Sequence, residues 1–156
     1  RLGAKVEAEF ATSGPGVADA AYNANAAALQ GHVGATPTTG ATEAQVIENL
    51  RTVPEMRFSS ESAAAYHVDK HVGELPPSEA PASSSPAARV TAYLASATET
   101  VHTGAVTSGV NQDGTRTLTF TRTVAEGSQS YTMQAIVVLT DDGHAFLATY
   151  FSTGRK

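Results

Sequence analysis

Apolar positions recur with a helical period through the first hundred residues of the chain. Spacings of three or four between apolar residues, Ala-rich stretches, capping residues and breakers such as Gly and Pro together predict amphipathic helices. The predicted helices cover residues 2–12, 17–30, 43–50, 61–71 and 89–98. Residues 34–40 and 75–86 are rich in Pro, Gly, Ser and Thr, so loops are expected there, the second being a mobile surface loop.

The period changes to two after residue 100, which indicates strands. The expected strands cover residues 101–107, 116–124, 131–139 and 144–151, and the connections contain Asp-Gly and Glu-Gly turn sequences. Leu118, Phe120 and Val124 alternate with threonines, so that strand has one apolar and one polar face. The pattern therefore predicts an α+β fold, in which N-terminal helices are followed by a four-stranded antiparallel β-meander.

Length and composition favour one compact domain. The 156 residues suffice for a single core, and we expect a helical N-terminal segment over residues 1–55 and an α+β region over 56–156 that carries the chemistry. The chain begins with Arg1, and no apolar leader follows, so it is interpreted as a mature or excised piece. No run of 18 apolar residues is present, so no membrane span is expected.

Cysteine content and charge exclude several classes of protein. The absence of cysteine rules out disulfide scaffolds, thiolate nucleophiles and cysteine-ligated zinc, including the usual zinc-dependent base deaminases. A net charge of −5 argues against a generic nucleic-acid coat protein, which binds through many Lys and Arg residues. An RNA-cleaving enzyme needs only a local basic cleft, so that class stays open.

The first candidate for chemistry is the His67-Val68-Asp69-Lys70-His71 segment. His67 and His71 are four residues apart on a predicted helix and so share a face, which Lys70 adjoins. One imidazole could take the proton of a ribose 2′-hydroxyl, the other could protonate the leaving 5′-oxygen, and the ammonium could stabilise charge on the phosphoryl oxygens. Two alternatives stay open: a chance pair on a solvated helix, and a zinc site completed by ligands that no spacing identifies.

The last predicted strand supplies the second group of candidates. Thr149, Tyr150 and Ser152 could donate hydrogen bonds to a phosphate, although aromatic residues in a strand are more often part of the core. Arg57 and Arg122 are further candidates for substrate binding, and Arg122 interrupts an otherwise apolar strand face. The alternative for each arginine is a solvated surface charge.

The order of these motifs resembles the toxin ribonucleases of the barnase/EndoU/colicin/RelE-like superfold, especially polymorphic-toxin and phage-associated members. The resemblance covers residues 64–152: the His-x-x-Lys-His element, a helix with a Tyr-Leu pair, Gly-turn hairpins and a final Thr-Tyr-Phe strand. It implies catalytic roles for His67, Lys70 and His71, with Thr149 assisting at the phosphate. The loop at 75–88 and the Ser-Thr-Gly-Arg-Lys ending depart from the family pattern.

Together these observations predict a secreted bacterial toxin domain that cleaves RNA without a metal or other cofactor. The expected partners are the RNA substrate and a cognate immunity protein, and the chain is expected to be a monomer that acts in the cytoplasm of a target cell. The alternative is a non-enzymatic secreted adhesion or partner-binding module. A third reading, ADP-ribosyl transfer, rests on residues 57–61 and ranks last because no Glu-x-Glu follows in the sheet.

Overall fold

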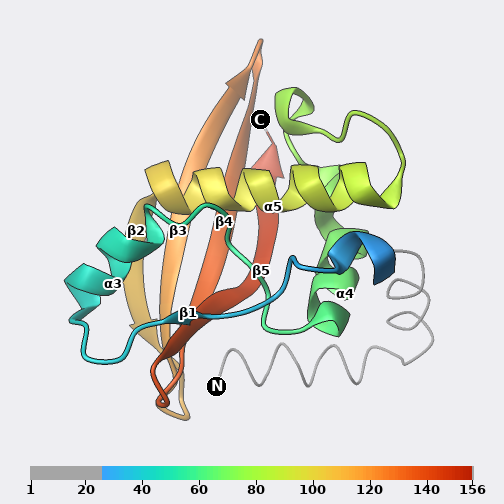
Figure 1. Cartoon of the computed structure of the whole chain (residues 1–156). Coiled ribbons are helices and arrows are strands. Elements are labelled where there is room, and N and C mark those ends of the chain that lie inside the picture. Colours follow the sequence, from blue (N-terminus) through green and yellow to red (C-terminus); the bar gives the residue numbers. More distant parts are fainter. Residues whose placement is uncertain (1–25, 156) are drawn as a thin grey trace.

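Helices cover one face of an antiparallel sheet in this protein. The structure, a computed structural model, describes residues 26–155, and Figure 1 shows the long helix α5 lying across the strands. The helix predicted over residues 2–12 and most of that over 17–30 lie outside the described residues, while residues 26–29 are helical. The helices are α3 (Glu43–Leu50), α4 (Glu61–His71) and α5 (Pro86–Thr103), with short 3-10 turns η1 (Val72–Glu74) and η2 (Pro77–Glu79).

The sheet has five strands in the order β1-β5-β4-β3-β2. The strands are β1 (Thr36–Pro37), β2 (Ala105–Val110), β3 (Arg116–Glu126), β4 (Gln129–Leu139) and β5 (His144–Arg155). The α+β class and the meander from β2 to β5 are confirmed. The expectation of four strands was wrong, because the two residues of β1 pair with Ala145 and His144 of β5. The β1 residues lie in the segment 34–40, which was predicted to be a loop. Two residues are too short to show a period of two.

Capping residues begin α3 and α4 where the sequence predicts these helices to start, whereas α5 begins at Pro86, three residues before its predicted start at residue 89. Thr42 forms a capping box with Gln45 at the start of α3, and the Ser60 side chain accepts from the Ala63 N–H at the start of α4. The helix α5 extends five residues beyond its predicted end at residue 98. Its C-terminal half contains several threonines, which are common in strands. Here their hydroxyls donate to backbone carbonyls four residues earlier, so the segment is helical. The strand that was predicted to begin at residue 101, β2, therefore begins at Ala105.

The core lies between α5, α4 and the inner face of the sheet. The largest fully buried side chains include Tyr93, Tyr150, Phe58 and Phe120, and the small residues Ala63, Ala64 and Ala65 let α4 approach closely. From residues 36–55, Val46 and Leu50 belong to the same core cluster. Within residues 26–155, no helix combines the length and the apolar character needed to cross a membrane.

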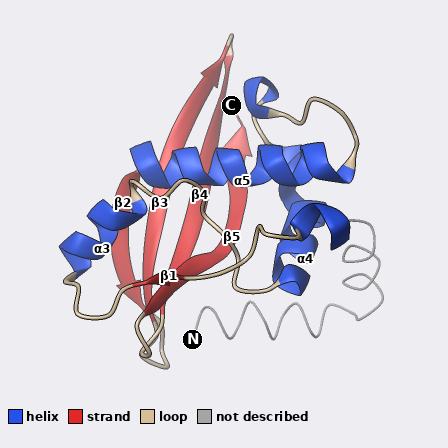
Figure 2. Cartoon of the chain, in the orientation of Figure 1, coloured by secondary structure: helices blue, strands red, loops and turns tan. Residues whose placement is uncertain are grey.

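The segment between α4 and α5, residues 72–85, is named the strap. Residues 75–86 were expected to be a mobile loop, but Leu75 and Pro76 are buried and Glu79 forms an ion pair with Arg122 on β3. The Ser78 N–H also donates to the Glu126 carboxylate at 2.6 Å. In Figure 2 the strap is the loop beside α5 that carries a short helical turn. Its first half is thus tied to the sheet, and only its second half is mostly exposed.

Candidate functional site

The helix α4 presents both predicted histidines to β5. Their rings stack with centroids 6.0 Å apart and planes 10° apart. The stack continues on one side to Phe58, whose ring centroid is 5.1 Å from that of His67. On the other side the Phe151 ring of β5 is tilted by 42° against His71, with the centroids 6.0 Å apart. A spacing of four on a helix places the two rings one above the other, as the sequence predicts.

His67 forms the inner end of this histidine pair. Its Nδ1 lies 3.3 Å from the Thr149 hydroxyl, and its Nε2 is buried without a hydrogen-bond partner. Burial, followed by the nearby His71 and Lys70 charges, lowers the pKa of His67 to about 3. His67 is therefore neutral near pH 7, and this suits a fixed hydrogen-bonding group better than a proton shuttle.

His71 forms the outer end, and the Glu74 carboxylate orients it. The His71 Nδ1 and the Glu74 Oε2 are 2.8 Å apart, and the His71 side chain is 14% exposed. The other carboxylate oxygen accepts from the Ser152 N–H at 2.9 Å, which fixes Glu74 against β5. A carboxylate on Nδ1 leaves Nε2 of a neutral imidazole free to accept a proton. The spacing of three residues between His71 and Glu74 is the sequence signal for this role.

Lys70 lies beside the histidines but on an exposed part of α4. Its ammonium is 3.4 Å from the Tyr66 hydroxyl and 5.5 Å from the centre of the Tyr66 ring. Arg57 is not with them. Its guanidinium binds Glu55 at 3.0 Å, and the same carboxylate lies 2.9 Å from the His32 Nδ1. The structure thus brings His67, His71 and Thr149 together, places Lys70 at their margin and leaves Arg57 in a separate cluster.

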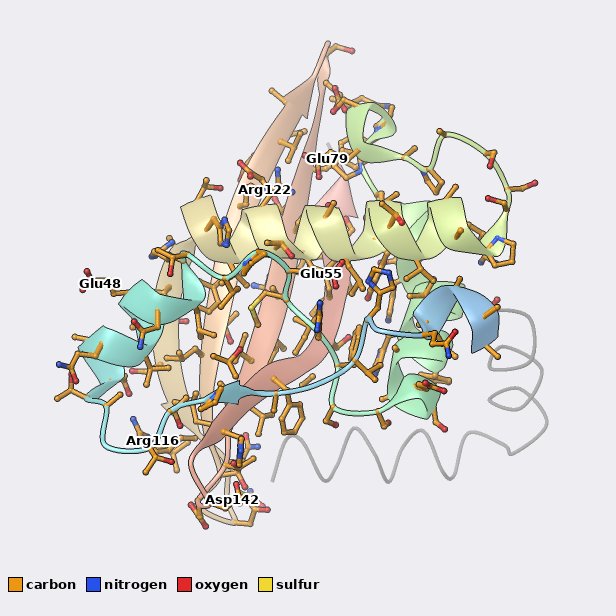
Figure 3. The ribbon with its side chains drawn as sticks, viewed as in Figure 1. Glu48, Glu55, Glu79, Arg116, Arg122 and Asp142 are labelled. Atoms are coloured by element: carbon orange, nitrogen blue, oxygen red, sulfur yellow. The ribbon has the colours of Figure 1, made fainter. Side chains whose placement is uncertain are left out.

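Arg122 and Tyr150 meet in a second polar cluster between the sheet and α5. The guanidinium binds both oxygens of Glu79 at 2.7 Å, and the Tyr150 hydroxyl lies 2.5 Å from the Ser96 hydroxyl. Figure 3 shows Arg122 and Glu79 on the same side of α5. These contacts lower the pKa of Glu79 despite its partial burial, with the Arg122 hydrogen bond as the main cause. A charge on an apolar strand face needs a partner, so Arg122 itself was the sequence signal for this cluster.

The two clusters are neighbours on the inner face of the sheet. The strand register aligns Arg122 of β3 with Met133 of β4 and Ser152 of β5. The Ser152 N–H binds Glu74, the partner of His71, so two strand spacings, roughly 10 Å, separate the Arg122 backbone from this contact. The predicted substrate-binding residues Arg122, Tyr150 and Ser152 therefore lie on the side of the sheet that holds the histidine pair, and all three are bonded to other residues of the protein.

Comparisons with known proteins add no identification. No protein family model matches the chain, no curated protein is detectably similar to it, and no solved structure matches it. Among the described residues, no group of three or more His, Asp or Glu side chains could hold a metal ion. The resemblance to toxin ribonucleases accordingly rests on the order of sequence motifs alone.

Proposed function

We propose that this chain is a metal-independent ribonuclease that acts through the ribose 2′-hydroxyl. The observation that supports the proposal best is the His71–Glu74 pair at 2.8 Å, positioned on β5 by the Ser152 N–H. A carboxylate that orients an imidazole is a recurring arrangement for general acid–base catalysis. Lys70 precedes His71 on the same helix and supplies a cation at the margin of this pair.

Each residue has a distinct role in the proposed reaction. The His71 Nε2 takes the proton of the 2′-hydroxyl, whose oxygen attacks phosphorus as the bond to the 5′-oxygen breaks. Lys70 stabilises the negative charge on the phosphoryl oxygens, and the leaving 5′-oxygen takes its proton from water. His67 is neutral and stacks under His71, and it binds Thr149 rather than exchanging protons. This assignment differs from the two-histidine scheme expected from the sequence.

The biological setting is part of the same proposal and rests on the resemblance. A toxin of this class is secreted, is delivered to the cytoplasm of a target cell, and is neutralised by an immunity protein in the producing cell. RNA is then the substrate, no cofactor is needed, and the chain acts as a monomer. The strap is the main departure from the family pattern, and it contacts both polar clusters through Glu74 and Glu79.

The test is cleavage of total RNA in excess EDTA. We expect the wild type to cut RNA and His71→Ala to be slower by about 10²- to 10⁴-fold, the usual contribution of a positioned acid–base group. Glu74→Gln should reduce the rate as well, because the tautomer of His71 is then less well fixed. His144→Ala is the matched control, since His144 pairs with Asp142 at 3.2 Å on an exposed hairpin far along the chain from α4.

Two outcomes would contradict the proposal. Cleavage that persists in the His71→Ala variant would place the activity elsewhere or in a contaminant. No cleavage by the wild type, across transfer, ribosomal and single-stranded RNA, would favour the alternative of a partner-binding module. One observation supports that alternative: β2 forms one edge of the sheet, carries no charged residue, and ends at Val110, which is 70% exposed.

A further inference from the structure

Arg122, Ser96 and Tyr150 form a set of hydrogen-bonding groups that we name the oxyanion cradle. Within it the guanidinium of Arg122 binds both oxygens of the Glu79 carboxylate at 2.7 Å. The Ser96 hydroxyl donates to one of these oxygens at 2.5 Å, and the Tyr150 hydroxyl in turn contacts both Ser96 and Arg122. Two parallel N–H donors with a hydroxyl beside them match the oxygens of a carboxylate and of a phosphate equally well.

The cradle is held in place by groups other than its occupant. The Arg122 Nε donates to the Thr100 hydroxyl at 3.0 Å, and its Nη2 also reaches the Ser96 carbonyl at 3.2 Å. The Tyr150 hydroxyl lies 3.0 Å from the same Thr100 hydroxyl. These contacts join β3, β5 and α5, so the donors stay aimed at the same point when Glu79 is removed. Such preorganisation is what distinguishes a binding site from a simple ion pair.

The carboxylate bound in the cradle, that of Glu79, belongs to the strap. Glu79 is the last residue of η2, and beyond it residues 80–85 are almost all exposed. A hollow of about 330 Å³ lies beside the cradle, between Ser78, Glu79 and Ala80 of the strap and the Ala92, Ala95, Ser96 and Glu99 positions of α5. Glu79 is 23% exposed and Arg122 13% exposed, so a ligand can reach the cradle from this side without opening the sheet.

We propose that the oxyanion cradle is a binding site for a phosphate group, and that the Glu79 carboxylate occupies it as an internal stand-in. A phosphate enters when the strap moves away, and it replaces one carboxylate with an anion of greater charge and more acceptor oxygens. The inference goes beyond the proposed ribonuclease activity and does not depend on it, because none of the cradle residues transfers a proton in that reaction. If RNA is the substrate, the cradle is suited to hold a phosphate next to the one that is cut.

The strap also connects this site to His71. It carries Glu74 at its start, which binds His71, and Glu79 in its middle, which binds Arg122. Displacement of Glu79 therefore loosens the same segment that positions Glu74. The strap, although rich in Ser and Pro, is therefore bound to the sheet at two places: Glu74 accepts from the Ser152 N–H, and Glu79 accepts from Arg122.

The experiment is calorimetric titration of inorganic phosphate into the whole chain at constant ionic strength. Wild type should bind weakly, and Glu79→Ala should bind at least about tenfold more tightly, since a charge-assisted pair no longer competes for the guanidinium. Glu99→Ala is the matched control: it removes the same charge from the same hollow but no contact with Arg122, and should bind as the wild type does. The double variant Glu79→Ala with Arg122→Lys should lose the gain, because an ammonium cannot make two parallel bonds.

Equal affinities in the wild type and Glu79→Ala, or a gain that survives Arg122→Lys, would overturn the proposal. If Glu79→Ala fails to fold, Glu79→Gln gives the same comparison, because the amide keeps the size of the side chain and one acceptor oxygen but loses the charge and the second acceptor that Arg122 binds. A short DNA oligonucleotide, which lacks the 2′-hydroxyl and is not cleaved by the proposed chemistry, forms the second arm. Binding of both probes identifies a nucleic-acid phosphodiester as the ligand, and binding of phosphate alone identifies a free phosphate group.

Discussion

Gly104 joins α5 to β2 at a point where no side chain fits. A Cβ at this position would lie 2.5 Å from the Thr100 carbonyl oxygen and 2.8 Å from the Thr121 carbonyl oxygen. The backbone φ of Gly104 is −74°, which any residue can adopt. Close approach, rather than unusual backbone geometry, therefore requires glycine here, and both obstructing atoms belong to regular hydrogen-bonded elements that cannot easily shift.

We expect Gly104→Ala to lower the free energy of unfolding by about 1–3 kcal/mol, the usual cost of overpacking. Gly73→Ala is the control, because nothing lies within 4 Å of its Cβ position and its φ is not positive. Urea denaturation followed by circular dichroism measures both. A Gly104→Ala variant as stable as Gly73→Ala would show that α5 and β3 are less closely packed than the structure indicates.

At the same scale, the sequence predicted which side chains share a helix face better than it predicted what surrounds them. The spacing of His67 and His71 correctly predicted that their rings share a face. It could not predict that His67 is buried against Phe58, because the tertiary fold decides which part of a helical face meets the core. Glu79 had no recognisable signal within a Pro- and Ser-rich segment, since its role depends on an arginine 43 residues away.

At the scale of elements, α3 and α5 are joined through their C-terminal ends. Arg51, the C-cap residue of α3, donates to the carbonyls of Val101, His102 and Gly104, each at 3.0 Å. Its guanidinium also lies 5.5 Å from the centre of the Phe120 ring. A cation at this end of α5 satisfies carbonyls that the helix leaves open and complements the helix dipole.

Arg51→Ala should therefore lower the free energy of unfolding by about 2–3 kcal/mol, since hydrogen bonds from a charged group are lost at a half-buried helix end. Arg51→Lys should restore little, because one ammonium cannot span three carbonyls. Arg116→Ala provides the control: it breaks an ion pair with Glu43 in which Arg116 is 52% exposed, and it should cost no more than about 1 kcal/mol. Thermal denaturation separates the cases, and equal losses for Arg51→Ala and Arg116→Ala would contradict this account of the helix ends.

Elements defined by local chemistry were predictable, and elements defined by distant contacts were not. The helices α3 and α4 begin at residues 43 and 61 as predicted, and the glycine turns divide the meander correctly. The strand β1 exists only because residues 36–37 meet β5, more than a hundred positions later. The end of α5 was missed because threonines favour strands in isolation, whereas here they bond back to the helix and pack against the sheet.

At the scale of the whole molecule, a row of rings runs through the core between the two polar clusters. His71, His67 and Phe58 stack, Phe58 packs on Tyr93, and Tyr93 meets Tyr150 edge to face. A titratable group buried in such a row links the stability of the whole fold to pH. Burial lowers the pKa of His67 to about 3, from an ordinary value of 6.5.

The sign follows from which state binds more protons. Below pH 6.5 the unfolded chain protonates His67, whereas the folded chain resists until about pH 3, so stability falls as the pH drops through this window. The slope approaches about 1.4 kcal/mol per pH unit within it. Glu79 acts in the same direction, since its pKa is lowered in the fold, but only below its ordinary value of 4.5. Between pH 6.5 and about 5, the contribution of His67 is therefore separate from that of Glu79.

We expect His67→Phe to flatten the dependence of the unfolding free energy on pH in that upper range, because the aromatic ring keeps the stack on Phe58 and removes the titrating group. The measurement is urea unfolding at a series of pH values, with the wild type and the exposed-site variant His144→Gln as references. The unfolding free energies of the two references should have the same slope against pH. The slope for His67→Phe should be smaller by up to the contribution of about one bound proton. Parallel curves for all three proteins would mean that His67 protonates in the folded chain as readily as in the unfolded one, and the neutral role given to it beside His71 would have to be withdrawn.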